Sequence, residues 1–274
     1  MKLLAVLAES LRLMRVEPKI YIPRVVTTLI YTVFILYTAR LSLRITNAVL
    51  LAQARAAALG TLPDFSAVFA QLAGSLATFA VFFLFAYAID ILSYGMYVRI
   101  VSDYHANRPI EIIQALRDVL GRVRTLVVLS LVILAFIAGI FFLYLLLGSA
   151  FLLTQRALFS MFALLVLLVG LVAFVLIFFF SIPVAMLEDK GVLNAISTSA
   201  KLGFKHKGIV IKINLVFAGL ILATLVVAMY TNFSGRTGVL AVGAFVVARL
   251  LQALVYTYIS IVNPDLYLHL EEAH

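Results

Sequence analysis

Cysteine and tryptophan are both missing from this chain of 274 residues, and charged residues are scarce. Without cysteine, the chain can form no disulfide, no zinc–thiolate site and no cysteine nucleophile. Without tryptophan, any aromatic belt at a membrane surface must consist of tyrosine and phenylalanine. Charged residues make up 12% of the chain, whereas a soluble domain carries about 25%. The polar side chains are therefore too few to cover a globule in water.

The sequence consists largely of long apolar stretches. Hydrophobic residues make up 65% of the chain, and the mean hydropathy is +1.17. About 20 apolar residues suffice for a helix to cross a bilayer, and the charge-free runs allow six such helices. We predict an all-α polytopic membrane protein in which residues 1–274 form one integral membrane domain. The expected spans are approximately 22–42, 66–98, 125–152, 157–186, 208–230 and 237–262.

Lysine and arginine are distributed unevenly over the connections between these spans. Fifteen of the 21 lie on one side, five lie on the other side, and Arg249 lies inside the last span. The basic side of a membrane protein normally faces the cytoplasm. The bias alternates through every connection, and an odd number of spans would break that alternation. The sequence therefore predicts a multi-pass protein of the cell membrane with both termini in the cytoplasm.

Each basic segment also has the periodicity of an amphipathic helix. Apolar residues recur at helical spacing in all three segments, next to arginine or lysine. Such helices lie in the plane of the lipid headgroups, so the N-terminal segment is expected to be an uncleaved interfacial helix. The chain is then three hairpins, each preceded by a cytoplasmic amphipathic helix. The apolar positions are Leu4, Leu7, Leu11 and Met14; Ile112, Leu116, Val119, Leu120 and Val123; and Leu193, Ile196, Ala200 and Phe204.

The net charge of +9 bears on the expected partners. In a soluble protein it would suit nucleic acid, but here the basic residues lie beside apolar spans. Anionic lipid headgroups are therefore the expected partner, and no nucleic acid is expected. Association with a second copy or with another membrane protein stays open.

Two charges fall inside the predicted spans, where an ionised group is costly unless it is paired or hydrated. Asp90 is the carboxylate and Arg249 is the cation. Both spans run towards the cytoplasm, and the depths of the two residues differ by roughly 7 Å at 1.5 Å per residue. An arginine side chain can bridge much of that distance, so we predict that the two residues pair.

Polar neighbours extend this predicted cluster along both helices. Tyr87 and Tyr94 share a helical face with Asp90, and Gln252 and Tyr256 share one with Arg249. One interpretation is an internal ion pair that fixes helix packing. The other is a polar cavity that binds an ion, a solute or a lipid headgroup. A catalytic role has less support, because hydrolysis commonly needs a second acidic group or a metal beside the one carboxylate.

The four histidines give no recognisable metal motif. His105 and His206 are assigned to basic connections, whereas His269 and His274 flank Glu271 and Glu272 in the segment after the last span. This spacing differs from that of the zinc-protease helix, which needs histidines four residues apart with glutamate next to the first. The sequence predicts no metal, no cofactor and no catalytic residue.

One segment resembles a known family. Residues 183–201 read PVAMLEDKGVLNAISTSAK, in which a span closes with proline, an acidic pair and glycine follow, and a helix then leads to the next span. This is similar to the membrane domain of glycerophosphoryl diester phosphodiesterases and of related prokaryotic multi-span families of unknown role. The resemblance implies an architecture and no activity, because the catalytic barrel of those enzymes has no counterpart in this sequence.

These observations favour a non-enzymatic integral membrane protein that serves as an accessory, scaffold or membrane-organising component. The alternative is a transporter of a small solute, ion or lipid that uses the polar cluster around Asp90 and Arg249. The three hairpins run in the same direction, whereas many transporters consist of inverted repeats.

Overall fold

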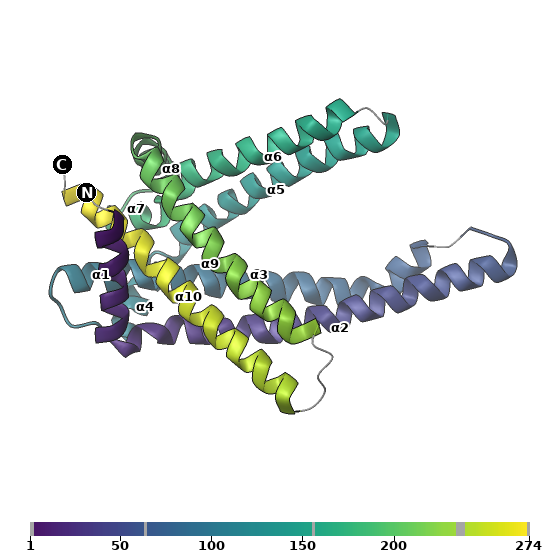
Figure 1. Ribbon diagram of the computed structural model, residues 1–274, viewed down its shortest axis with the longest axis horizontal. Coiled ribbons are helices and arrows are strands. Elements are labelled where there is room, and N and C mark those ends of the chain that lie inside the picture. Colours follow the sequence, from purple (N-terminus) through teal and green to yellow (C-terminus); the bar gives the residue numbers. More distant parts are fainter. Residues whose placement is uncertain (1–2, 63–64, 155–156, 234–238, 273–274) are drawn as a thin grey trace. The chain divides into compact units, whose positions relative to one another are not determined.

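The structure is a computed structural model that describes residues 3–62, 65–154, 157–233 and 239–272 (Figure 1). It is 93% helical, and no strand occurs in these ranges. Six helices of the described chain are long and apolar enough to cross a membrane. The prediction of an all-α polytopic membrane protein is therefore confirmed.

The six long helices correspond to the six predicted spans. The fourth is interrupted and continues as a short helix, and the last begins at Val239, so residues 237 and 238 of the predicted span lie outside the described residues. The helices are α2 (Ile22–Leu59), α3 (Phe65–His105), α5 (Val123–Thr154), α6 (Ala157–Phe178) with α7 (Ser181–Leu187), α9 (Lys207–Phe233) and α10 (Val239–Glu272).

A separate helix precedes each pair of long helices, as the sequence predicts. These helices are α1 (Leu3–Val16), followed by the 3-10 turn η1 (Pro18–Tyr21), then α4 (Ile112–Gly121) and α8 (Val192–Lys205). Each buries small or apolar residues at helical spacing against the protein, such as Ala195, Ser199 and Gly203 in α8. Large apolar side chains on the same helices stay exposed; Leu193 is 80% exposed and Phe204 is 53% exposed.

The chain divides into two compact units within this helical architecture. Unit 1 comprises residues 1–24 and 91–274, and unit 2 comprises residues 25–90. The divisions fall inside α2 and α3, so each of these helices contributes to both units.

Unit 2 is the hairpin formed by most of α2 and the first part of α3. Phe34 packs against Phe79 and Phe82, with ring centroids 5.3 and 5.5 Å apart. The Tyr37 hydroxyl donates a hydrogen bond of 3.0 Å to the Ser75 carbonyl. Helix α2 continues to Leu59, which agrees with the helix that the alanine-rich segment after Arg44 favours.

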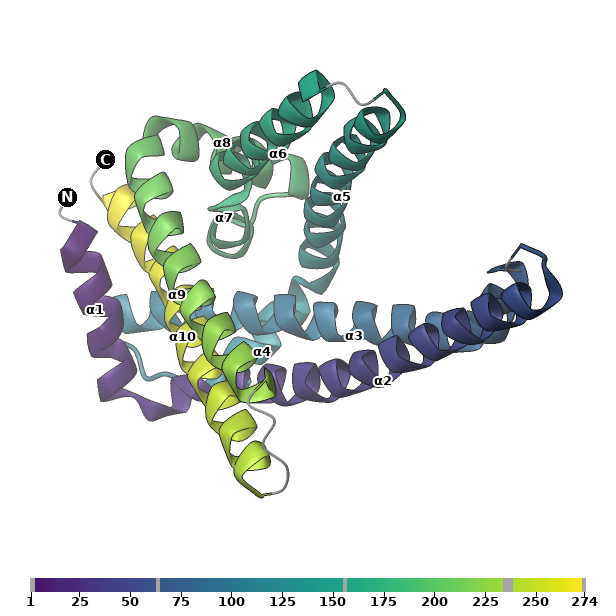
Figure 2. The same ribbon diagram turned by 45° about the vertical axis from the view of Figure 1, so that its right-hand side comes forward.

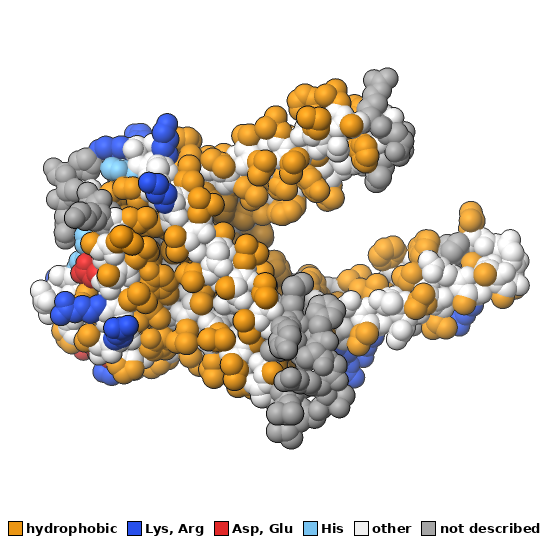
Figure 3. Space-filling view, in the orientation of Figure 1, with side chains coloured by type: hydrophobic (Ala, Val, Ile, Leu, Met, Phe, Trp, Pro, Cys, Tyr) orange, Lys and Arg blue, Asp and Glu red, His pale blue; other side chains and the backbone are white. Residues whose placement is uncertain are grey.

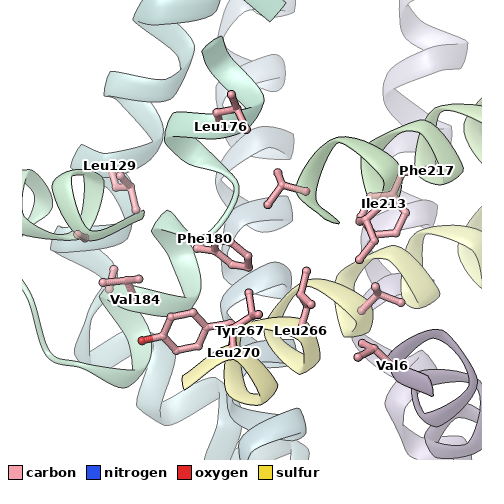
Figure 4. Close-up of a cluster of buried hydrophobic side chains, with 14 residues drawn as sticks. Val6, Leu129, Leu176, Phe180, Val184, Ile213, Phe217, Leu266, Tyr267 and Leu270 are labelled. Carbon is pink, nitrogen blue, oxygen red and sulfur yellow. The ribbon is translucent and has the colours of Figure 1, made fainter. Parts of the chain in front are cut away.

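The core of unit 1 lies where α1, α7 and α8 meet α9 and α10, and the last two helices run side by side in two views (Figures 1 and 2). Buried side chains from seven helices contact one another there (Figure 4). Val6 of α1, Phe180 beside α7 and Leu266 of α10 are completely buried in this cluster. Since α10 contributes residues as late as Leu270, its C-terminal part belongs to the core.

The interruption between α6 and α7 leaves backbone groups that need partners, because hydrocarbon offers no hydrogen bonds. Ser199 of α8 supplies two of them. Its hydroxyl donates to the Ile177 carbonyl at 2.7 Å and accepts from the Phe180 amide at 3.1 Å. The side-chain amide of Asn263 on α10 donates to the Phe179 carbonyl at 2.7 Å. The break is therefore a built feature to which α8 and α10 both contribute.

Helix α8 approaches α6 closely at Gly203. A Cβ atom at this position would lie 1.9 Å from the Leu176 carbonyl oxygen, which is a backbone atom that cannot rotate away. Glycine is thus the residue that permits the contact on which the Ser199 hydrogen bonds depend.

We predict that Gly203→Ala destabilises the protein by about 1–3 kcal/mol, the usual cost of overpacking a closely packed site. Gly208→Ala is the matched control, because no atom lies within 4 Å of a Cβ there. Thermal unfolding in detergent, followed by far-ultraviolet circular dichroism, measures the difference. Equal midpoints for the two variants would contradict the close approach.

Candidate functional site

Three of the predicted site residues lie on α10 and have defined partners in unit 1. The Arg249 guanidinium donates a hydrogen bond of 2.6 Å to the Gln252 side chain one turn later, and Gln252 is buried. The ring of Tyr256 faces the Arg24 guanidinium at 5.8 Å. Arg24 had been counted only as a flanking charge, but its Nε and Nη2 atoms donate to the Ser260 hydroxyl at 3.1 and 2.7 Å.

Tyr94, in the part of α3 that belongs to unit 1, lines a cavity of about 210 Å³. The cavity is mostly aromatic and apolar, with the amides of Asn214 and Asn263 in its wall. The Oδ1 atom of Asn263 is buried and has no hydrogen-bond partner among the described residues. This cavity brings together residues from α3, α5, α6, α7, α9 and α10.

The other two predicted site residues, Tyr87 and Asp90, belong to unit 2. The Tyr87 ring stacks on Phe83, with centroids 6.1 Å apart. Arg249 belongs to unit 1, so the Asp90–Arg249 pair stays a prediction.

A second polar cluster, which the sequence did not predict, lies at the ends of α3 and α10. The carboxylate of Asp265 is 2% exposed, and its Oδ1 atom lies 2.8 Å from His105 Nε2 and 3.2 Å from His269 Nδ1. The two imidazole rings are nearly perpendicular, with centroids 5.2 Å apart. We call His105, Asp265 and His269 the histidine–aspartate cluster.

Helix α1 completes the surroundings of this cluster. The Ser10 hydroxyl donates to the other Asp265 oxygen, Oδ2, at 2.6 Å, and Ser10 is buried. The Glu9 carboxylate lies 3.3 Å from His269 Nε2. The Tyr258 hydroxyl donates to the Leu7 carbonyl at 3.3 Å and fixes α1 against α10. Glu9 and Ser10 are therefore positioned by the packing of α1.

The cluster was missed because its histidines were assigned to a connection and to the segment after the last span. His105 is the last residue of α3, and α10 continues through Pro264 to Glu272. Proline removes one backbone hydrogen bond from a helix, but the burial of Leu266 and Leu270 in the core holds the helix together beyond it. The one available signal was the four-residue spacing of Asp265 and His269, which places them on one helical face.

A third polar feature is a cavity of about 630 Å³ between the end of α3, α4 and the residues after α7. We call it the arginine pocket, because Arg99, Arg117 and Arg122 line it together with Asp118 and Asp189. Arg122 Nη1 lies 3.2 Å from Asp189 Oδ1 and donates to the Ala185 carbonyl at 2.9 Å. These contacts join the connection between α4 and α5 to α7 and the residues after it.

The arginines that line the arginine pocket differ in their ion pairs. Arg99 Nε lies 3.2 Å from the Asp103 carboxylate and 3.1 Å from the Asp118 carboxylate. Its buried N–H nevertheless points at no acceptor among the described residues. Arg117 is exposed and has no ion pair within the described part of the chain. The pocket therefore presents the Arg117 guanidinium to an added anion, whereas Arg99 and Arg122 already have acidic partners.

Comparison with protein-family models, with curated proteins and with solved structures finds no match for this chain. The resemblance of residues 183–201 to a phosphodiesterase membrane domain therefore stays a prediction.

Proposed function

We propose that this integral membrane protein is a non-enzymatic, membrane-organising component that binds anionic phospholipid at the cytoplasmic surface of the cell membrane. The observation that carries the proposal is the arginine pocket, where three guanidinium groups surround a cavity of about 630 Å³. Arginine is the side chain best suited to hold a phosphate, because its planar fork of donors matches the phosphate oxygens.

Exposed apolar side chains on the short helices support the same role. Leu4 of α1 is 78% exposed, Ile113 of α4 is 76% exposed and Leu193 of α8 is 80% exposed. All three helices lie at one end of unit 1 (Figure 1). Large apolar residues that water would disfavour are stable at the boundary between headgroups and acyl chains. The helices would thus lie in that boundary with their small residues against the protein.

Basic side chains gather at the same end of unit 1. Figure 3 shows lysine and arginine over α1 and around α8 and the start of α9, whereas the α5–α6 hairpin presents a hydrophobic surface. Charge and apolar exposure therefore point to one surface of unit 1. A surface of this kind suits a bilayer leaflet rich in anionic lipid, with about 1 kcal/mol of attraction for each basic residue near it.

The cavity beside Tyr94 supports a second candidate function, the transport of a small solute, ion or lipid. It lies among six helices, and the unsatisfied Oδ1 of Asn263 borders it. Proteoliposomes with a trapped pH-sensitive dye test for ion flux. This candidate predicts a protein-dependent flux that Asn214→Leu lowers, because leucine removes the amide from the cavity wall. Flux that is equal in empty vesicles would contradict it.

For the first candidate, we predict that phosphatidylglycerol raises the unfolding temperature of the detergent-solubilised protein more than phosphatidylcholine does. Circular dichroism is the appropriate measurement, because the chain has no tryptophan. The difference between the two lipids should shrink in the double variant Arg117→Gln/Arg122→Gln and at high salt, since salt screens exposed charges.

Lys201→Gln is the matched control, because Lys201 is an exposed basic residue of α8 that does not line the arginine pocket. It should retain the full difference between the two lipids. Comparing lipids within each variant separates lipid binding from any intrinsic loss of stability. An undiminished difference in the double variant would contradict the proposed site.

A further inference from the structure

We propose that the histidine–aspartate cluster is a binding site for a divalent transition metal of the Zn²⁺ class. The ligands would be His105 Nε2, His269 Nδ1 and Asp265 Oδ1. One ligand atom from each residue lies within 4.8 Å of the others. Neighbouring ligands of a tetrahedral zinc ion are roughly 3.4 Å apart, as follows from bond lengths of about 2.0–2.2 Å. Coordination by all three atoms would require them to move closer together and His269 Nδ1 to give up its 2.9 Å contact with the Asp265 carbonyl oxygen.

The charge balance at Asp265 favours a cation. This carboxylate is 2% exposed, and an unpaired buried charge is strongly destabilising. Its ion-pair partners among the described residues are the two histidines. No lysine or arginine of the described chain pairs with it. A divalent ion would supply a permanent positive charge at this position.

The surroundings match those that orient metal ligands in proteins. A ligating histidine usually donates its other ring N–H to a carboxylate, and a ligating carboxylate is itself hydrogen-bonded. Glu9 lies 3.3 Å from His269 Nε2, the ring nitrogen that faces away from Asp265 Oδ1. The Ser10 hydroxyl holds Asp265 Oδ2 at 2.6 Å and leaves Oδ1 directed at the histidines. Both contacts come from α1, so α1 positions the ligands without contributing one.

The donor set indicates the class of metal. Two imidazole nitrogens with one carboxylate suit zinc and its neighbours in the first transition row, whereas calcium and magnesium prefer oxygen ligands alone. Three protein ligands leave a fourth position for water or another small ligand. Bound metal would also tie the last residue of α3 to α10.

The test is a zinc titration of the untagged, chelator-treated full-length protein in detergent. After gel filtration, elemental analysis should give one zinc per chain for the wild type. His105→Gln/His269→Gln should lose this zinc, and His206→Gln should keep it, because His206 lies outside the cluster. Cobalt should give the visible absorption of a tetrahedral site when it is added to the wild type. It should give no such absorption with His105→Gln/His269→Gln.

A milder variant guards against misfolding. Glu9→Gln keeps all three ligands but replaces the carboxylate next to His269 Nε2 with a neutral amide. The zinc affinity of this variant should therefore fall by about 10- to 100-fold. Glu17→Gln is its control and should bind zinc like the wild type. The proposal is overturned if the wild type binds no zinc beyond the double histidine variant. It is likewise overturned if Glu9→Gln and Glu17→Gln bind zinc equally, because Glu9 would then have no part in the site.

Discussion

The hydrocarbon of a bilayer offers no hydrogen bonds, so the backbone groups that an interrupted helix leaves must find their partners within the chain. The constraint is most visible at the interruption between α6 and α7. Ser199 and Asn263, from two other helices, satisfy the carbonyl and amide groups that the interruption leaves. A local irregularity in one helix therefore determines where α8 and α10 must lie. Gly203 permits the close approach of α8 to the backbone of α6.

Helix α10 collects most of these polar contacts. Its residues bond to Arg24 at the start of α2, to the interruption after α6, to His105 of α3 and to Ser10 of α1. The Tyr97 hydroxyl, which donates to the Ile20 carbonyl at 2.7 Å, lies 3.5 Å from the Thr257 hydroxyl. The C-terminal half of α10 is consequently both a core element and the element on which the polar chemistry is placed.

The sequence was sufficient for the six long helices and for the short helix before each hairpin, because both follow from composition and periodicity along the chain. It was insufficient for contacts between distant segments. Ser10 and Asp265 are 255 positions apart, and no periodicity relates them. The same limit applies to Arg24 and Ser260, since Arg24 looks like one more flanking charge until Ser260 is placed beside it.

The polar residues of α10 illustrate the difference between what local periodicity predicts and what only tertiary packing determines. Gln252 lies one turn after Arg249 on α10, and the two side chains are hydrogen-bonded. The histidine–aspartate cluster depends instead on α10 continuing beyond Pro264. Local propensity argues against such a continuation, whereas burial of Leu266 and Leu270 in the core enforces it. Tertiary packing therefore determines the position of Asp265 and His269 in the histidine–aspartate cluster.

We propose that the end of unit 1 formed by α1, α4 and α8 faces the cytoplasm. Because the chain has no cysteine, single cysteines can be introduced without background. Thr61, after α2, and Ser197, on α8, are both exposed. With a membrane-impermeant maleimide on intact cells, the account predicts labelling of Thr61→Cys at once and of Ser197→Cys only after permeabilisation. The reverse pattern, or labelling of both variants in intact cells, would contradict it.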